Sequence, residues 1–374
     1  MSAPAPAAAT GRPCPPGAAP LAAVDDLQVS AEGGRVEVIA GVPVRLDDPN
    51  LCGHFPGFPV FPGVFIVEAL VQAVDIALRG AGRPRLRLRS VDAVRFLAPL
   101  LPPDRLTLDI VAVADGPERW AVTASGRRDD GTVTVTLRAR FDGSAPDRPD
   151  GSDVADRPDG GIATTAGLVT TTAGSAGPAS AGLGQHQVRA LLPQRFPLLL
   201  VDRVLTMTPG TRIEAVKAVT ATEPCYRDLT DDAPPGDYAY PASLLVESLG
   251  QTAALLWLAE ADGPVGDDQV LMFVGARDFV FDSAAYPGDV LRHTVHLERV
   301  IADTAFATGE TYVGDRRIAR VGTLMAARRP RTALTAPAPV GAATATPPGA
   351  GVSTAREPSR RGTPPPPSTL RWKG

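Results

Sequence analysis

Cysteine is scarce in this chain of 374 residues, which contains only Cys14, Cys52 and Cys225. Three scattered cysteines can build neither a disulfide framework nor a zinc site. Such sparse, unpaired thiols are typical of the reducing cytosol. The N-terminus also lacks the basic patch and the continuous apolar run of a secretory signal. We therefore expect a cytoplasmic protein.

Strong charge and membrane-length apolar runs are missing as well. The net charge of −4 argues against a whole-chain nucleic-acid binder, which is usually basic. The most apolar stretches, 64–78 and 244–258, contain Glu, Gln or Asp and fall short of a membrane span. No Gly-rich phosphate loop or metal-ligand spacing is found. We expect a soluble protein with no metal and no nucleotide cofactor.

Glycine and proline, by contrast, are abundant, with 37 and 39 residues. They concentrate in three segments that lack the apolar side chains needed to offset the entropy of ordering. We predict a disordered N-terminus over 1–20, a flexible linker over 143–184 and a disordered Pro-rich tail over 331–374. The remaining chain then forms two domains, 21–142 and 185–330.

The two domains repeat one another. Residues 62–72 (PGVFIVEALVQ) match 241–251 (PASLLVESLGQ) at a constant offset of 179 positions. Residues 96–104 (FLAPLLPPD) parallel 281–289 (FDSAAYPGD) at an offset of 185. Two blocks in the same order indicate a duplicated domain rather than a solenoid, whose period is far shorter.

Each half is predicted to contain one long helix and several strands. Pro62 and Pro241 suit the first turn of a helix, where a missing N–H costs nothing. The helices that follow are apolar on nearly every face, so we expect other elements to wrap them. Segments of alternating polarity, joined by Gly and Asp turns, predict antiparallel strands; they are 85–89, 106–110, 132–137, 290–297 and 304–311. The prediction is an α+β fold.

Three ionisable side chains stand out. Glu68 and Glu247 occupy matching positions inside the apolar helices, where an unpaired carboxylate is costly or has a raised pKa. Each could instead be a tolerated interface carboxylate, bonded to the glutamine one turn later. His54, in the turn Gly53–Gly57, could be an ordinary loop histidine. A neutral imidazole beside a protonated carboxyl group is, however, an acid–base pair that works near pH 7.

Residues 53–72 (GHFPGFPVFPGVFIVEALVQ) closely resemble the active-site segment of the bacterial (3R)-hydroxyacyl-[acyl-carrier-protein] dehydratases of fatty-acid and polyketide synthesis. Residues 191–204 (LLPQRFPLLLVDRV) resemble the N-terminal signature of the same family, and 215–224 and 286–289 continue the match. The resemblance covers about two-thirds of the chain. It implies two hot-dog units, here a double hot-dog, with each active site taking its histidine from one unit and its acid from the other.

The resemblance implies one complete site and one degenerate site. His54 precedes Glu68 by 14 positions, whereas the position 14 before Glu247 is Ala233. His54 should therefore face Glu247, while Glu68, together with Gly63 and Ala233, should form the degenerate second site.

Substrate binding is expected from the backbone amide of Ala242, and from Gly57 and Gln251. Free N–H groups at a helix N-terminus suit a developing enolate. The family has Pro-Gly at that spot. This chain has Pro241-Ala242 beside Glu247, and the added methyl group should narrow the pocket.

The implied reaction is syn elimination of water from a (3R)-3-hydroxyacyl thioester, giving the trans-2-enoyl thioester. His54 would take the α-proton and Glu247 would protonate the leaving hydroxyl. Glutamate, in place of the aspartate of the isomerising branch, favours dehydration alone. The implied partner is an acyl carrier protein, or coenzyme A, whose phosphopantetheine carries the substrate, and no other cofactor is expected. The arginines over 79–95 could attract such a carrier, or mark the solvated face of a strand.

Other readings stay open. A hot-dog thioesterase or enoyl hydratase is possible, although a thioesterase has no necessary role for the histidine of 53–57. A non-catalytic partner in a synthase complex is also possible, because the second histidine has been lost. The retention of both His54 and Glu247 favours the dehydratase. The pseudo-dimer could act alone or as a homodimer of chains.

Overall fold

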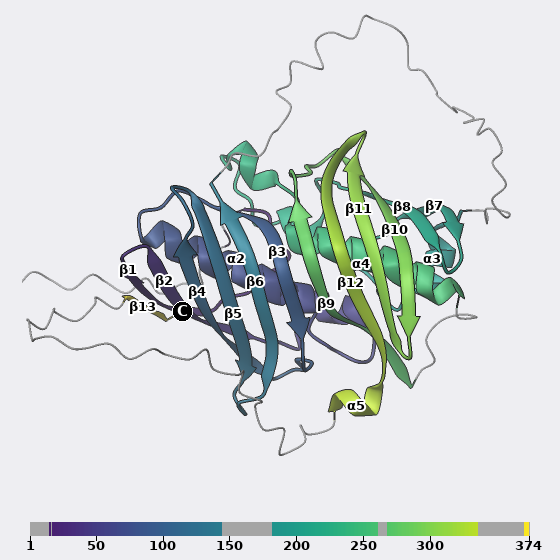
Figure 1. Cartoon of the computed structure of the whole chain (residues 1–374), viewed down its shortest axis with the longest axis horizontal. Helices are drawn as coiled ribbons and strands as arrows, with labels where there is room; N and C mark the ends of the chain where they lie inside the picture. The colour runs from purple at the N-terminus through teal and green to yellow at the C-terminus, as the bar shows by residue number, and fades with distance from the viewer. Residues whose placement is uncertain (1–14, 16, 144–181, 261–267, 336–369, 374) are drawn as a thin grey trace, which may run out of the picture.

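One long buried helix in each half is wrapped by a shared antiparallel sheet (Figure 1). The computed structural model describes residues 15, 17–143, 182–260, 268–335 and 370–373. The helices are α1 (Pro49–His54), α2 (Gly63–Gly80), α3 (Gln185–Leu191), α4 (Ala242–Glu260) and α5 (Arg331–Thr335). The strands are β1 (Asp26–Glu32), β2 (Arg35–Pro43), β3 (Arg87–Phe96), β4 (Arg105–Ala114), β5 (Arg119–Arg128), β6 (Val133–Asp142), β7 (Arg203–Thr208), β8 (Arg212–Ala218), β9 (Gln269–Phe281), β10 (Val290–Ile301), β11 (Thr304–Val313), β12 (Arg316–Pro330) and β13 (Leu370–Lys373).

The sheet is continuous across both halves, in the order β13-β1-β2-β4-β5-β6-β3-β9-β12-β11-β10-β8-β7. The halves meet at β3 and β9, and their strand orders mirror one another about this junction. The pairing is itself symmetric, because Ser90 lies opposite Val280 and Arg95 lies opposite Gly275. The offset of 185 relates Ser90 to Gly275 and Arg95 to Val280, so it exchanges the two pairs. The predicted antiparallel strands are confirmed, and the pseudo-two-fold axis passes between β3 and β9.

The two long helices lie against the inner face of this sheet and contact each other. Their apolar side chains are buried on nearly all sides because the sheet covers one face and the partner helix another. The segment 235–259 is long and apolar enough to cross a membrane by composition, contrary to expectation, but most of it is buried inside the protein. It therefore contains α4, the core helix of the second half.

Hydrogen bonds repeat the symmetry at the level of atoms. The amide of Gln72 donates to the carbonyl oxygen of Leu21 at 2.9 Å and accepts from the N–H of Ala23 at 2.9 Å. Gln251 makes the same pair of bonds with Leu198 and Leu200, at 2.6 and 2.8 Å. Each glutamine thus ties the segment at the start of its half to the central helix.

The domain boundaries extend further than the composition predicted. The N–H groups of Ala18 and Ala19 donate to the carbonyls of Asp237 and Cys225, so the end of the segment 1–20 is ordered. Leu183 exchanges two backbone bonds with Val204, and α5 and β13 fall in the expected tail. The rest of the predicted disorder (1–14, 16, 144–181, 336–369 and 374) lies outside the described residues.

Candidate active site

His54 ends the short helix α1, and the residue is only 9% exposed. The Nδ1 atom lies 2.8 Å from the carbonyl oxygen of Val60. Because a carbonyl only accepts, Nδ1 carries the proton and Nε2 of the neutral ring presents a lone pair. Burial lowers the pKa of His54, while Glu247 and the Val60 carbonyl oppose that shift. The ring is thus held as a neutral base.

The loop that carries His54 is held between parts of the second half. The N–H of Arg195 donates to the carbonyl of Gly53 at 2.7 Å. A Cβ atom at Gly53 would stand 2.7 Å from the Arg195 oxygen and 2.8 Å from that of Phe196, so this close approach requires glycine. On its other side the loop packs through Phe55 and Val60 against apolar side chains of β9 and α5.

Glu247 lies in the second turn of α4 and is 8% exposed. Its Oε1 accepts from Nε2 of Gln251 at 2.9 Å. The charge of Glu247 raises the pKa of His54. The loop of His54 is hydrogen-bonded at Gly53 to Arg195, in the segment that Gln251 ties to the helix of Glu247. The pairing of His54 with Glu247, and not with Glu68, stays a prediction, which this arrangement supports.

Gln251 was expected to bind substrate, but its hydrogen bonds are already used. Its two N–H donors go to Leu198 and Glu247, and its oxygen accepts from Leu200. The residue therefore positions Glu247 and leaves no donor for substrate. Gly57, also expected to bind substrate, has φ of +77° in the turn before α2. That conformation explains its glycine, and a contact with substrate stays a prediction.

The structure reverses the assignment of Ala242 and Gly63. The hydroxyl of Ser243 donates to Oε2 of Glu68 at 2.6 Å, so the start of α4 lies beside Glu68. Ala242 and Glu68 line one pocket. Since the halves are related by the offset of 179, the start of α2 correspondingly lies beside Glu247. By this symmetry the amide of Gly63, and not that of Ala242, is the one expected beside Glu247.

The Glu68 half-site has a carboxyl group without a histidine. Glu68 is 6% exposed and accepts from Ser243 and from Nε2 of Gln72 at 2.9 Å. Burial raises its pKa, and the two hydrogen bonds oppose the shift. No histidine is among the residues that line its pocket.

Ala233 does not line that pocket either, which corrects its expected place. Val44 and Val219 make equivalent backbone hydrogen bonds in the two halves, and so do Phe61 and Tyr240. The second loop is therefore four residues longer than the first, and the constant offset fails inside it. Tyr240 and Asp237 from this loop line the pocket instead.

Two features of the Glu68 pocket escaped the sequence analysis. One is the bond from Ser243, which no periodicity reveals. The other is that the arginines at 85, 87 and 89 line this pocket instead of standing only on a solvated strand face. Within the described residues, no group of three His, Cys, Asp or Glu side chains is arranged to hold a metal ion.

Comparison with known proteins assigns both halves. Residues 30–132 match a family described as ApeI dehydratase, and residues 192–322 match the FabA-like domain. The 3-hydroxyacyl-[acyl-carrier-protein] dehydratase FabZ of Paracidovorax citrulli is 38% identical over 130 residues, which are 35% of this chain and 86% of that protein. The enzyme of the same name from Variovorax paradoxus is 38% identical over 144 residues, 38% of this chain and 93% of the relative.

A solved structure shows the same fold. The dehydratase domain from the CurJ module of curacin polyketide synthase superimposes with a TM-score of 0.54 at 11% sequence identity. The match covers 84% of this chain and 98% of that domain. Both halves of the chain therefore take part in the likeness, and the expected double hot-dog fold is confirmed.

Proposed function

Because this chain belongs to the FabZ family of 3-hydroxyacyl-[acyl-carrier-protein] dehydratases, we propose that it dehydrates its substrate at one composite site per chain, made by His54 and Glu247. The enzyme is a hydro-lyase of fatty-acid or polyketide biosynthesis. The proposal specifies which of the two half-sites works and what each side chain does there.

His54 is the base and Glu247 the acid. Nε2 of His54 takes the proton from the carbon α to the thioester carbonyl, and the C–H electron pair becomes the new double bond. The β-carbon–oxygen bond breaks, and its oxygen leaves as water with a proton from the Glu247 carboxyl group. The proton on His54 then returns to Glu247, which closes the cycle.

Negative charge that develops on the thioester oxygen needs a donor. The N-terminus of α2 supplies free N–H groups and the positive end of a helix dipole. Gly63 begins this helix, and a Cβ atom there would stand 3.0 Å from the ring of Phe96. Glycine thus keeps the amide accessible where Phe96 packs closely.

The observation that carries the proposal is that the loop of His54 is hydrogen-bonded at Gly53 to Arg195 of the second half, in the segment that Gln251 ties to the helix of Glu247. It unites a buried imidazole, whose Nδ1 is fixed by Val60, with a carboxyl group fixed by Gln251. Glu68 has no such histidine beside it, so the second half-site lacks the base.

The substrate is proposed to arrive as a thioester on the phosphopantetheine arm of an acyl carrier protein. The relatives carry that carrier in their names. The chemistry above needs only side-chain acid and base and a backbone donor, so we propose that no further cofactor takes part. We also propose that the protein works in the cytoplasm and that a single chain, a pseudo-dimer, is sufficient.

The test uses the purified chain with a short (3R)-3-hydroxyacyl carrier protein and follows the enoyl product by mass spectrometry. His54→Ala and Glu247→Gln should each lower the rate about 10²- to 10⁴-fold, the usual contribution of a general acid or base. Glu68→Gln is the matched control and should retain the rate. Equal loss in Glu68→Gln would overturn the composite site, and release of free acid by the wild type would identify a thioesterase.

A further inference from the structure

His293 lies on β10, where this strand packs against the helix that carries Glu247. The residue is completely buried. Its Nε2 atom lies 2.8 Å from Ser248 Oγ, and its Nδ1 atom lies 2.9 Å from Thr311 Oγ1. Ser248 follows Glu247 directly in α4, and Thr311 lies opposite His293 on β11. The imidazole therefore connects the sheet to the central helix beside the proposed acid.

A continuous chain of hydrogen bonds leads from this ring to Glu247. Because the Ser248 hydroxyl donates to the carbonyl of Leu200 at 2.6 Å, its oxygen accepts from Nε2 of His293. The N–H of Leu200 donates to Oε1 of Gln251 at 2.8 Å, and Nε2 of Gln251 donates to Oε1 of Glu247 at 2.9 Å. Each member is fixed by its neighbour, so the loss of one bond loosens the rest of the chain.

In the first half, small or apolar residues occupy the matching positions. At the offsets of 185 for the strands and 179 for the helix, they are Leu108, Gly126 and Ala69 in place of His293, Thr311 and Ser248. A Cβ atom at Gly126 would stand 2.9 Å from Leu108, so the leucine fills the space that two polar side chains share in the second half. The polar chain is thus specific to the half whose carboxyl group is proposed to be catalytic.

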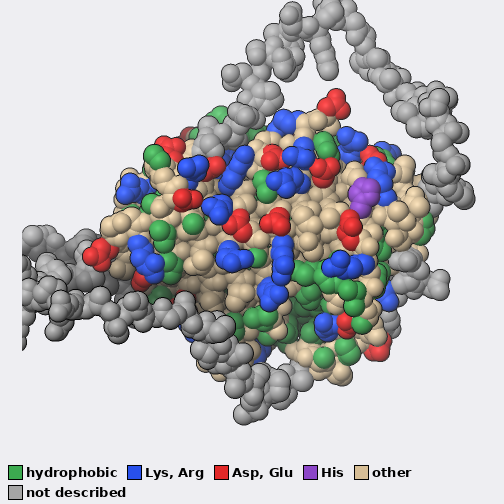
Figure 2. All heavy atoms as spheres, viewed as in Figure 1, with side chains coloured by type: hydrophobic (Ala, Val, Ile, Leu, Met, Phe, Trp, Pro, Cys, Tyr) green, Lys and Arg blue, Asp and Glu red, His purple; other side chains and the backbone are tan. Residues whose placement is uncertain are grey.

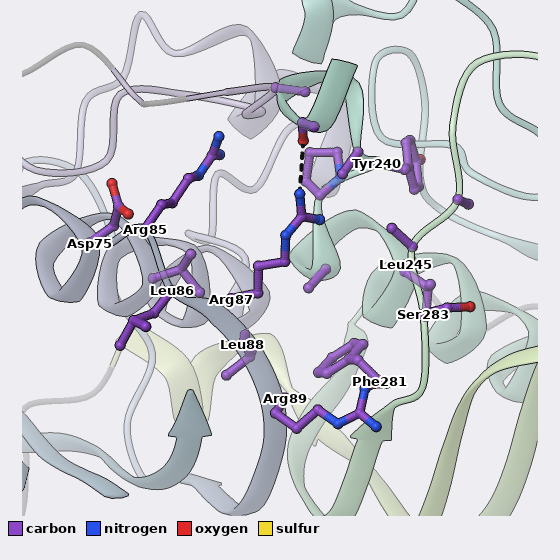
Figure 3. Close-up of a pocket in the computed structure, with 18 of the residues that line it drawn as sticks. Asp75, Arg85, Leu86, Arg87, Leu88, Arg89, Tyr240, Leu245, Phe281 and Ser283 are labelled. Carbon is purple, nitrogen blue, oxygen red and sulfur yellow. Dashed lines mark hydrogen bonds between the residues drawn. The ribbon is translucent and has the colours of Figure 1, made fainter. Parts of the chain in front are cut away.

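The two buried carboxyl groups also differ in what holds them. Glu68 lines the pocket shown in Figure 3, and its two oxygens accept from Ser243 and Gln72. The described partner of Glu247 is Gln251, on one oxygen. The position of the catalytic carboxyl group therefore depends on how firmly the Gln251 amide is held.

We propose that His293 is a positioning residue for the dehydration, which holds the carboxyl group of Glu247 in place through Ser248, Leu200 and Gln251. The inference rests on the proposed function, because it requires Glu247 to be the acid. His293 acts through this chain and not on the substrate. A loosened carboxyl group still lets the substrate bind but protonates the leaving hydroxyl less often, so the chain should govern kcat and not KM.

The experiment compares the dehydration kinetics of His293→Leu and His293→Gln in the full chain, with a short (3R)-3-hydroxyacyl carrier protein as substrate. Leucine installs the counterpart residue and breaks the chain, so we expect kcat to fall about tenfold while KM stays within about twofold. Glutamine can still donate to Ser248 and accept from Thr311, and it should restore most of kcat. Urea unfolding of each variant gives the folded fraction to which kcat is referred. A folded His293→Leu with the wild-type kcat would overturn the inference.

A second background separates positioning from a general loss of structure. Glu247→Gln already lacks the acid, so the addition of His293→Leu should lower its residual rate less than about twofold, because the chain then has no carboxyl group to place. A general disturbance of the fold would lower the rate by the same factor in both backgrounds, and that result would overturn the inference.

Matched variants keep the outcome readable. Leu108→Ala truncates the core at the matching position of the first half, and it should reduce stability while kcat stays unchanged. Ser248→Ala installs the other counterpart and should lower kcat by a similar factor, which keeps the test open if His293→Leu does not fold. A wild-type rate in Glu247→Gln would refute the proposed function. Loss of activity in Glu247→Gln together with an unchanged kcat in folded His293→Leu would refute this inference alone.

Discussion

The hydroxyl of Ser243 donates to Glu68 across the two central helices, at 2.6 Å. At the other crossing the position that matches Ser243 is Val64, which has no donor. Glu68 consequently has both oxygens engaged, by Ser243 and Gln72, whereas the described partner of Glu247 is Gln251 on one oxygen. The two carboxyl groups therefore differ in how many of their oxygens are free to bind a substrate, as well as in whether a histidine lies near them. Glu247 keeps an oxygen for the hydroxyl of a substrate.

A polar side chain at position 64 should lower kcat, whereas an apolar one at position 243 should not, because only the half-site of Glu247 is proposed to be catalytic. Val64→Thr places a hydroxyl of similar size beside Glu247, where it competes with the substrate hydroxyl, and we expect kcat to fall on the order of tenfold. Ser243→Val, the matched control, frees Glu68 and should leave kcat unchanged. Steady-state dehydration assays decide the matter, and an unchanged rate in folded Val64→Thr would contradict the placement of Val64 beside Glu247.

The pKa of His54 should respond to Glu247 in a defined direction. Burial lowers this pKa below its usual value of 6.5, and the Glu247 carboxylate raises it in opposition. The neutral base therefore persists below pH 6.5, so the acid limb of kcat/KM should lie below that value. Glu247→Gln removes the charge that Glu247 carries when it has given up its proton, and the pKa of His54 should fall further. Nuclear magnetic resonance titration of the labelled His54 ring measures it, and a rise in pKa would contradict the pairing.

Gly63 should be the glycine whose replacement costs activity. A methyl group there would stand 3.0 Å from the Phe96 ring, which must shift over the amide proposed to bind the thioester oxygen. We expect Gly63→Ala to lower kcat/KM about tenfold or more, because small displacements at a reacting centre are costly. Ala242→Gly in the other half should have no effect on the rate. The opposite pattern would restore the assignment of Ala242 to the working site.

The sequence predicted most of the fold because its signals are local. Two apolar helices that begin after Pro62 and Pro241 and a period of two in the strands were sufficient for the α+β reading and the duplication. The outer face of the sheet, where acidic and basic side chains intermingle, reflects the same alternation (Figure 2). The hydrogen bond from Ser243 to Glu68 could not be predicted from the sequence, because it depends on how the two long helices pack against each other. Ala233 was misplaced because a four-residue insertion breaks the offset.

Helix α5 also contributes to the site, although the composition of its segment predicted a disordered tail. Leu334 of α5 packs in one cluster with Phe55, Val60 and Val270. Val60 supplies the carbonyl that holds Nδ1 of His54.

Leu334→Ala should therefore loosen the catalytic loop. We expect kcat to fall several-fold while the free energy of unfolding drops by about 2 kcal/mol, the lower end for such a truncation because α5 is peripheral. Val300→Ala, at a side chain that is 41% exposed, serves as the control for removal of apolar surface. Loss of stability with an unchanged kcat would show that Leu334 does not position His54.

His293 should make the protein sensitive to mild acid although it lies outside the proposed site. It is fully buried, with Nε2 2.8 Å from Ser248 Oγ and Nδ1 2.9 Å from Thr311 Oγ1. The Ser248 hydroxyl donates to the Leu200 carbonyl, so Nε2–H donates to Ser248 and Nδ1 accepts from Thr311. This arrangement accommodates the neutral ring that burial favours.

Burial, with a smaller contribution from Lys217, lowers the pKa of His293 from 6.5 to about 3. Between these values the unfolded chain binds more protons than the folded one, so stability falls as pH falls, by about 1.4 kcal/mol per unit. Between pH 7 and 5 the wild type should lose about 2 kcal/mol more than His293→Gln, as measured by urea unfolding. His296→Gln, on the exposed side of β10, should keep the wild-type loss. Equal acid sensitivity in wild type and His293→Gln would mean that this histidine is not held neutral, because its buried ring could then accept a proton without opposing the fold.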